Sequence, residues 1–207
     1  MCGVNIEHFK DDFQLLIRTI SHETFHRLQL HVCPIDPSKK NRHPKFDDLV
    51  HYPFPDKKDR KLYEVLTYIF LEGSATFVGG VSSEAQTDKK AIEGLKLLRE
   101  IHRAIYEETD FEKTEKLLNS GLKSNGPFYA LGYHMTNSIV DKYSSSAIGE
   151  SLLEGSSGFF KRYFEAHRGI SQNRRSEFLL FGRKIKEKVN ELGSRAQKEL
   201  QEKHQTR

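Results

Sequence analysis

Five residues near the N-terminus have the spacing of a metal-binding helix. His22-Glu23-Thr24-Phe25-His26 is an HExxH motif. Residues four apart on an α-helix differ by about 40° around the axis and lie ~6 Å apart along it, so both imidazoles would leave one face and could bind one ion. Glu23 could then reach a water on the metal without binding the metal itself, as a general base must. The motif predicts zinc-activated hydrolysis, and the alternative is two ordinary polar histidines on a helix.

A catalytic zinc site needs three protein ligands and an open position, so a third ligand is expected downstream. Three histidines are weak candidates for it. His31 follows the motif by five residues, but Gln29 and Val32 stand where a metzincin-type metal helix would need a glycine and a histidine. His43 and His51 lie in a proline-rich segment that fixes neither side chain.

Glu72 is the stronger candidate for the third ligand. It interrupts the apolar run 68–71, which makes a solvated role unnatural for its carboxylate. Three small residues follow it at 73–75, and they would let two helix backbones approach closely enough for a short side chain to reach the ion. The sequence therefore predicts a site built from His22, His26 and Glu72.

Helices must position these groups, and the apolar residues recur at the steps of three and four that helices need. The pattern predicts a helix at 6–30, capped by Asn5, and a second at about 59–78 that stops at the glycines 79–80. Further helices are expected at 88–106, 110–118 and 128–143, as two shorter pieces between 147 and 166, and at 177–200. No stretch alternates convincingly with period two, so the expected fold is mainly α, with the HExxH helix and the Glu72 helix side by side.

The length of 207 residues suits one domain with a tail. We expect a catalytic domain over 1–170 and a charged amphipathic helix with its tail over 171–207. The single apolar stripe of that helix either packs back onto the domain or pairs with another chain as a homo-oligomer. The segment 34–55 holds five of the six prolines, so we expect a long loop that borders a cleft, and a strand is expected only within 32–58 or 80–87.

Charge and composition limit the partners. The net charge of +4 comes from 33 basic and 29 acidic residues that are largely interspersed, which argues against a nucleic-acid partner. No apolar run reaches 18 residues, so no membrane span is expected, and two cysteines exclude a disulfide framework. The chain shows no signal peptide, which makes the cytoplasm the default compartment. The metal helix begins almost at Met1, so the chain could also be the C-terminal part of a longer protein.

The two motifs together resemble the gluzincins, the thermolysin-like clan of zinc peptidases. In that clan an HExxH helix and a glutamate on the next helix bind zinc, and some members write the second helix as EGxA. Here HETFH at 22–26 is followed, 46 residues after its last histidine, by EGSA at 72–75. The resemblance implies a zincin-like domain that binds Zn²⁺ and cleaves a peptide or protein substrate, with His22, His26 and Glu72 as ligands and Glu23 as base.

A third segment extends the resemblance. The run 126–135 is similar to a third helix of bacterial zinc-dependent peptidases of this type. The resemblance implies that Tyr133 or His134 on this helix donates to the oxyanion that develops during attack. The alternative for Tyr133 is a place in the core with its hydroxyl at the rim.

Two features depart from the gluzincin pattern. Gluzincins place a sheet before the metal helix, and its edge strand holds substrate, whereas five residues precede the predicted helix here. Thr76 stands where thermolysin relatives carry an acidic residue that orients a histidine, so its hydroxyl, Asp47 or Asp48 would have to take that role. The alternative function is a catalytically silent, zinc-stabilised binding module, although such a module would not need Glu23.

Overall fold

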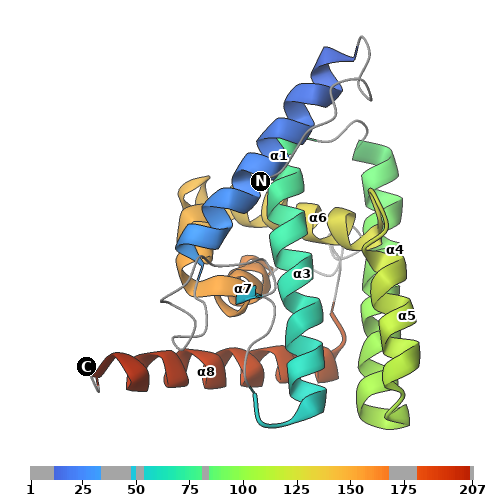
Figure 1. Ribbon diagram of the computed structural model, residues 1–207, viewed down its shortest axis with the longest axis vertical. Helices are drawn as coiled ribbons and strands as arrows, with labels where there is room; N and C mark the ends of the chain where they lie inside the picture. The colour runs from blue at the N-terminus through green and yellow to red at the C-terminus, as the bar shows by residue number, and fades with distance from the viewer. Residues whose placement is uncertain (1–11, 34–47, 50–53, 81–83, 168–180, 206–207) are drawn as a thin grey trace.

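The computed structural model describes residues 12–33, 48–49, 54–80, 84–167 and 181–205 (Figure 1). Helices make up nearly all of these residues, and no strand occurs among them, which confirms the mainly α fold. The helices are α1 (Phe13–Val32), α3 (Lys57–Gly79), α4 (Glu84–Arg103) with its π-helical extension η3 (Ala104–Glu108), α5 (Phe111–Gly121), α6 (Pro127–Tyr143), α7 (Ser146–Ala166) and α8 (Arg183–Gln205). Within the described ranges, none of these helices combines the length and the apolar character that a bilayer crossing needs.

Aspartates fix the starts of three helices. The side chains of Asp12, Asp56 and Asp110 accept backbone N–H groups in the first turns of α1, α3 and α5. Because Asp12 caps α1, this helix begins at Phe13, later than predicted, and the predicted cap Asn5 lies outside the described residues. Gly80, with φ of 82°, ends α3 where the two glycines predicted a stop.

Helix α3 is the central element of the fold. Its buried side chains point to several neighbours and include Leu62, Val65, Leu66, Ile69, Phe70 and Leu71. In Figure 1, α1 crosses α3 diagonally near its upper end, α6 passes behind it and α8 runs across its lower end, and all three contact it. A helix enclosed on most sides is apolar around most of its circumference, so a polar group on it is conspicuous.

Helix α7 contains the two shorter pieces that the sequence predicted. They are joined at Gly155, whose backbone has φ of 69° and ψ of −162°. Glycine adopts this conformation without the steric cost that a Cβ would add. Immediately after the kink, the hydroxyl of Ser156 accepts a hydrogen bond of 3.1 Å from Thr67 of α3, and both groups are buried.

The last helix packs back onto the domain. The apolar stripe of α8 is buried mainly against α7 and α3 and consists of Ile185, Val189, Leu192 and Ala196. These side chains belong to the same hydrophobic core as α3 and α7. The stripe that could have joined two chains is therefore covered within one chain. The predicted division at residue 170 stays a prediction.

A buried carboxylate attaches α8 to the beginning of α3. Asp59 accepts from Lys188 Nζ at 2.9 Å, from Arg195 at 2.5 Å and from the hydroxyl of Tyr106 at 2.8 Å. We call these four residues the Asp59 cluster. Burial raises the pKa of Asp59, but the hydrogen bonds from Lys188, Tyr106 and Arg195 outweigh it and leave the pKa below its ordinary value.

The predicted proline-rich loop lies largely outside the described residues. Of its positions, Asp48, Leu49, Phe54 and Pro55 are described; the first three are buried and Pro55 is exposed. Residues 81–83, where a strand was conceivable, also lie outside, and α4 begins directly after them at Glu84.

Candidate metal centre

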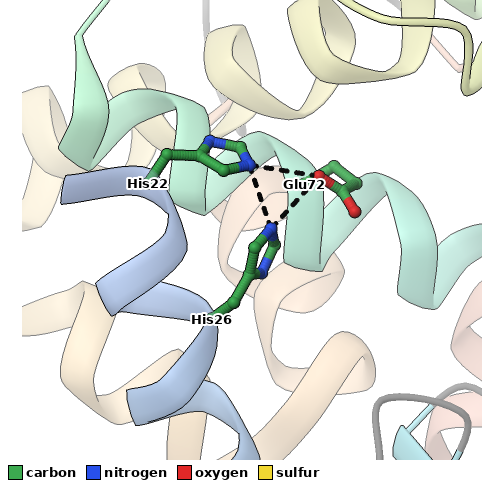
Figure 2. Close-up of side chains that lie close together, drawn as sticks. All are labelled: His22, His26 and Glu72. Carbon is green, nitrogen blue, oxygen red and sulfur yellow. Dashed lines mark hydrogen bonds and ion pairs between the residues drawn. The ribbon is translucent and has the colours of Figure 1, made fainter. Parts of the chain in front are cut away.

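Three side chains from two helices converge on one point. His22 and His26 leave the same face of α1, Glu72 leaves α3, and Figure 2 shows the three side chains pointing toward one another. Glu72 Oε2 lies 3.4 Å from His22 Nε2 and 3.3 Å from His26 Nε2, and the two nitrogens are 2.9 Å apart. The structure therefore brings together the three residues that the sequence predicted as ligands.

The donor set and its spacing fit zinc. Zinc sites in proteins take histidine nitrogen and carboxylate oxygen at ~2.0–2.1 Å in a tetrahedral arrangement, which sets ligand atoms about 3.3 Å apart. Two of the three separations agree with this value, and the third is somewhat shorter. Three ligands would leave the fourth position for water or substrate, as catalytic zinc sites do.

Close helix crossings hold the two ligand helices together. A Cβ added at Gly79 of α3 would lie 2.8 Å from the carbonyl oxygen of Arg18 and 3.2 Å from Cβ of His22, so α1 passes α3 where only glycine fits. On the other side, a Cβ at Gly73 would lie 2.1 Å from Cα of Gly132 on α6. The glycine after Glu72 thus admits α6, and α3 is fixed between α1 and α6 at the metal site.

Gln29 forms a buried hydrogen-bond network behind the site. Its Oε1 lies 2.6 Å from His26 Nδ1, and its Nε2 donates to the carbonyl oxygen of Leu71 and to the hydroxyl of Ser74, both at 2.9 Å. Gln29 has no exposed surface, and Ser74 donates onward to the carbonyl of Phe70 at 2.7 Å. A polar contact to His26 Nδ1 therefore comes from Gln29, one turn later on α1, whereas Asp47, one of the groups expected to orient a histidine, lies outside the described residues.

The electrostatics suit a cation. Burial raises the pKa of Glu72. The hydrogen bonds from His22 and His26 and the charges of these two imidazoles lower the pKa by more, so it falls to about 2. Burial lowers the pKa of His26, while the hydrogen bond and charge of Glu72, the amide of Gln29 and the charge of Glu23 raise it above its ordinary value. Two imidazoles thus face a negatively charged carboxylate. A divalent cation between these groups would be attracted by that charge.

Tyr129 lies beside the ligand cluster, and the charge of Glu23 acts on it. The half-buried Glu23 follows His22 on α1, and its charge raises the pKa of both His26 and Tyr129. Tyr129 of α6 has its ring 6.2 Å from the His22 ring at an interplanar angle of 21°. Burial first, then the charge and hydrogen bonding of Glu72, raise the pKa of its hydroxyl. The role of Glu23 as the base stays a prediction, and Tyr129 was not singled out as a site residue.

The family described as putative zinc dependent peptidase (DUF5700) matches residues 4–171. The chain belongs to this family. The match covers the three converging residues together with Glu23, Gln29 and Tyr129. No curated protein and no solved structure matches the chain. The family description names zinc, and the His-His-Glu group could hold a metal ion.

The other predicted site residues of this DUF5700 chain lie as follows. The ring of Tyr133 packs 5.8 Å from that of Phe77, and His134 Nε2 lies 2.5 Å from a carboxylate oxygen of Asp88 on α4. Thr76 donates its hydroxyl to the backbone carbonyl of Glu72 at 2.7 Å. The roles of Tyr133 and His134 stay predictions.

Of the alternative third ligands, His31 lies among the described residues of this DUF5700 chain, and it is not part of the cluster. His31 is exposed near the end of α1, and the three-residue group that could hold a metal does not include it. His43 and His51 lie outside the described residues. Among the described residues, Glu72 is the carboxylate that joins the two histidines.

Proposed function

We propose that this chain is a zinc metallopeptidase of the gluzincin type that hydrolyses peptide bonds in a peptide or protein substrate. The observation that carries the proposal is the convergence of His22, His26 and Glu72 with Glu23 beside them. A structural zinc site needs four protein ligands and no base, whereas this arrangement supplies three ligands and a carboxylate next to them. The family description supports the same class of activity.

In the proposed mechanism, His22, His26 and Glu72 hold zinc, and Glu23 moves the proton. When bound, zinc lowers the pKa of a coordinated water toward ~7 and polarises the scissile carbonyl. Glu23 accepts a proton from the attacking water as the new C–O bond forms. It then gives this proton to the amine nitrogen as the C–N bond breaks, so the carboxylate is regenerated at the end of the cycle.

A hydrogen-bond donor for the developing oxyanion comes, in this proposal, from Tyr129. Its hydroxyl is hydrogen-bonded to Glu72, and a tyrosine hydroxyl is protonated at neutral pH, as a donor must be. Tyr133 lies one helical turn further along α6 and packs on Phe77. We expect Tyr129→Phe to lower kcat by roughly 10²–10³-fold, the usual effect of losing one oxyanion donor, and Tyr133→Phe to have a smaller effect.

The test compares zinc content and peptide cleavage in the wild type and Glu23→Gln. We expect one zinc per chain in both proteins and a fall in kcat/KM of roughly 10²–10⁴-fold in the variant, because the base is lost while the ligands stay. Glu93→Gln is a matched control, since Glu93 is an exposed carboxylate on α4 and its loss should change neither quantity. A mixed peptide library serves as substrate because no sequence preference has to be assumed.

The other outcomes separate the alternatives. Zinc bound at one per chain without any cleavage would make this protein a zinc-stabilised binding module. Wild-type protein that takes up no zinc would refute both readings and leave a helical scaffold without a metal.

A further inference from the structure

The network behind the metal centre has a role that the proposed function leaves open. We infer that Gln29 is the positioning residue of this site: it holds the His26 ring with Nε2 facing the ion and attaches that ring to the backbone beside Glu72. The inference rests on the proposed metal site. It assigns the buried amide a role in metal binding in addition to its contribution to stability.

The amide of Gln29 can adopt only one orientation. Its two other contacts, the carbonyl oxygen of Leu71 and the hydroxyl of Ser74, lie 2.9 Å from Nε2. The Leu71 carbonyl can only accept, so the nitrogen must face it and the oxygen must face His26. A flipped amide would place oxygen against oxygen in a region without solvent, because Gln29 is fully buried.

This orientation decides the tautomer of His26. The Gln29 oxygen, 2.6 Å from His26 Nδ1, can only accept, so Nδ1 carries the hydrogen. In a neutral imidazole the other nitrogen then holds the lone pair, and His26 Nε2 is the atom that faces Glu72 and His22. Histidine ligands of metals are commonly fixed in this way by an acceptor on the second nitrogen.

The same side chain joins the two ligand helices. Gln29 lies three residues after His26 on α1, and its donor contacts are on α3, at Leu71 and Ser74 on either side of Glu72–Gly73. A movement of α1 along α3 would break the amide contacts before it separated His26 from Glu72. Gln29 therefore sets both the orientation of one ligand and its distance from another.

The test separates the acceptor of Gln29 from its donors. Zinc dissociation constants are measured by competition with a chromophoric chelator for the wild type, Gln29→Leu and Gln29→Glu. We expect Gln29→Leu to weaken zinc binding about 10–100-fold, the usual effect of losing a partner behind a ligand. Gln29→Glu keeps an acceptor for His26 and should bind zinc more tightly than Gln29→Leu, although both variants lose the contacts to α3 and should unfold more easily without metal.

Thr67→Val is the matched control. It also removes a buried hydrogen bond of α3, the one to Ser156, but on the α7 side of the helix. We expect it to lower stability without changing the zinc dissociation constant. A second readout is the nitrogen-15 spectrum of metal-free protein at a pH high enough to leave the imidazole neutral, where His26 should be a single Nδ1–H tautomer in the wild type and a mixture in Gln29→Leu.

The results distinguish this inference from the proposed function. A zinc affinity in Gln29→Leu equal to that of the wild type overturns the positioning role and leaves the metal site in place. An equal loss of zinc affinity in Thr67→Val also overturns it, because general destabilisation would then explain both. Absence of zinc from the wild type overturns the metal site itself, and the role of Gln29 with it.

Discussion

The crossing of α3 and α6 beside the metal centre allows a quantitative prediction for Gly73→Ala. The new Cβ would lie 2.1 Å from Cα of Gly132, whereas 3.4 Å is an ordinary contact, so the two helices would have to separate by about 1.3 Å. Both groups are backbone atoms, so no flexible side chain can move aside. Overpacking of this kind costs roughly 1–3 kcal/mol, and the cost here should lie at the upper end.

Alanine also favours the helix by about 1 kcal/mol over glycine, which offsets part of this cost. We therefore expect Gly73→Ala to lower the free energy of unfolding by about 2 kcal/mol. For a chain of this size, that loss lowers Tm by roughly 4–8 °C. Zinc affinity should fall as well, because Glu72 stands directly before Gly73 and would move when the two helices separate. Tyr129, three residues before Gly132 on α6, would move away from Glu72.

Urea denaturation followed by circular dichroism measures the effect, with Gly149→Ala as the control. Gly149 lies in α7, and a Cβ there would meet nothing within 4 Å, so alanine should stabilise the protein by ~0.5–1 kcal/mol. If both alanine variants were equally stable, α3 and α6 would not touch at these glycines, and the account of the site's rigidity would be wrong.

Three further predictions concern stability, metal binding and thiol reactivity. Asp59→Asn should lower the free energy of unfolding by about 2 kcal/mol at pH 7, since it leaves two partly exposed cations of α8 without their carboxylate. The folded pKa of Asp59 lies below its unfolded value of ~3.9, so its contribution to the free energy of unfolding is complete above that pH and is lost as the pH falls. Urea denaturation at pH 3 should therefore show a smaller difference in stability between the variant and the wild type. Zinc at 100 times its dissociation constant should add about 2.7 kcal/mol and raise Tm by roughly 5–10 °C in differential scanning calorimetry, an increase that a chelator or Glu72→Ala should abolish. Burial raises the pKa of the Cys33 thiol to about 12, so in a Cys2→Ser background iodoacetamide at pH 8 should label Cys33 only after denaturation, and rapid labelling of folded protein would contradict its burial.

The helices could be predicted from the sequence because their signals are local. The spacing of apolar residues and the glycines 79–80 placed α3 at 59–78, and the structure has it at Lys57–Gly79. The π-helical turn at Ala104–Glu108 was not predicted, because it continues α4 and a change from α- to π-helical hydrogen bonding leaves the apolar pattern almost unaltered. The first helix begins at Phe13 because the side chain of Asp12 accepts the backbone N–H of Leu15, a cap that the apolar pattern at 6–30 did not indicate.

The ligands of the candidate site were also accessible to sequence reasoning, whereas the groups around them were not. His22 and His26 are fixed by one helix, and Glu72 is marked by its unusual place in an apolar run. Gln29 was considered only as the residue that replaces a glycine, since nothing local reveals that its amide meets the backbone of α3. Tyr129 depends on which turn of α6 lies beside Glu72, and the contact between Gly73 and Gly132, which decides this, is a property of the packed helices.

The Asp59 cluster has a consequence for the order in which the chain folds. Asp59 and Arg195 are 136 positions apart, so the charge at the start of α3 receives its cationic partners only after the chain has been synthesised as far as α8. Contacts between such distant segments slow folding because a long loop must close before they form. Residues 22, 26 and 72 would thus leave the ribosome well before the beginning of α3 is attached to α8. We expect the native geometry of the three ligand residues to form late, at the step in which α8 packs against the other helices and the domain folds as one unit.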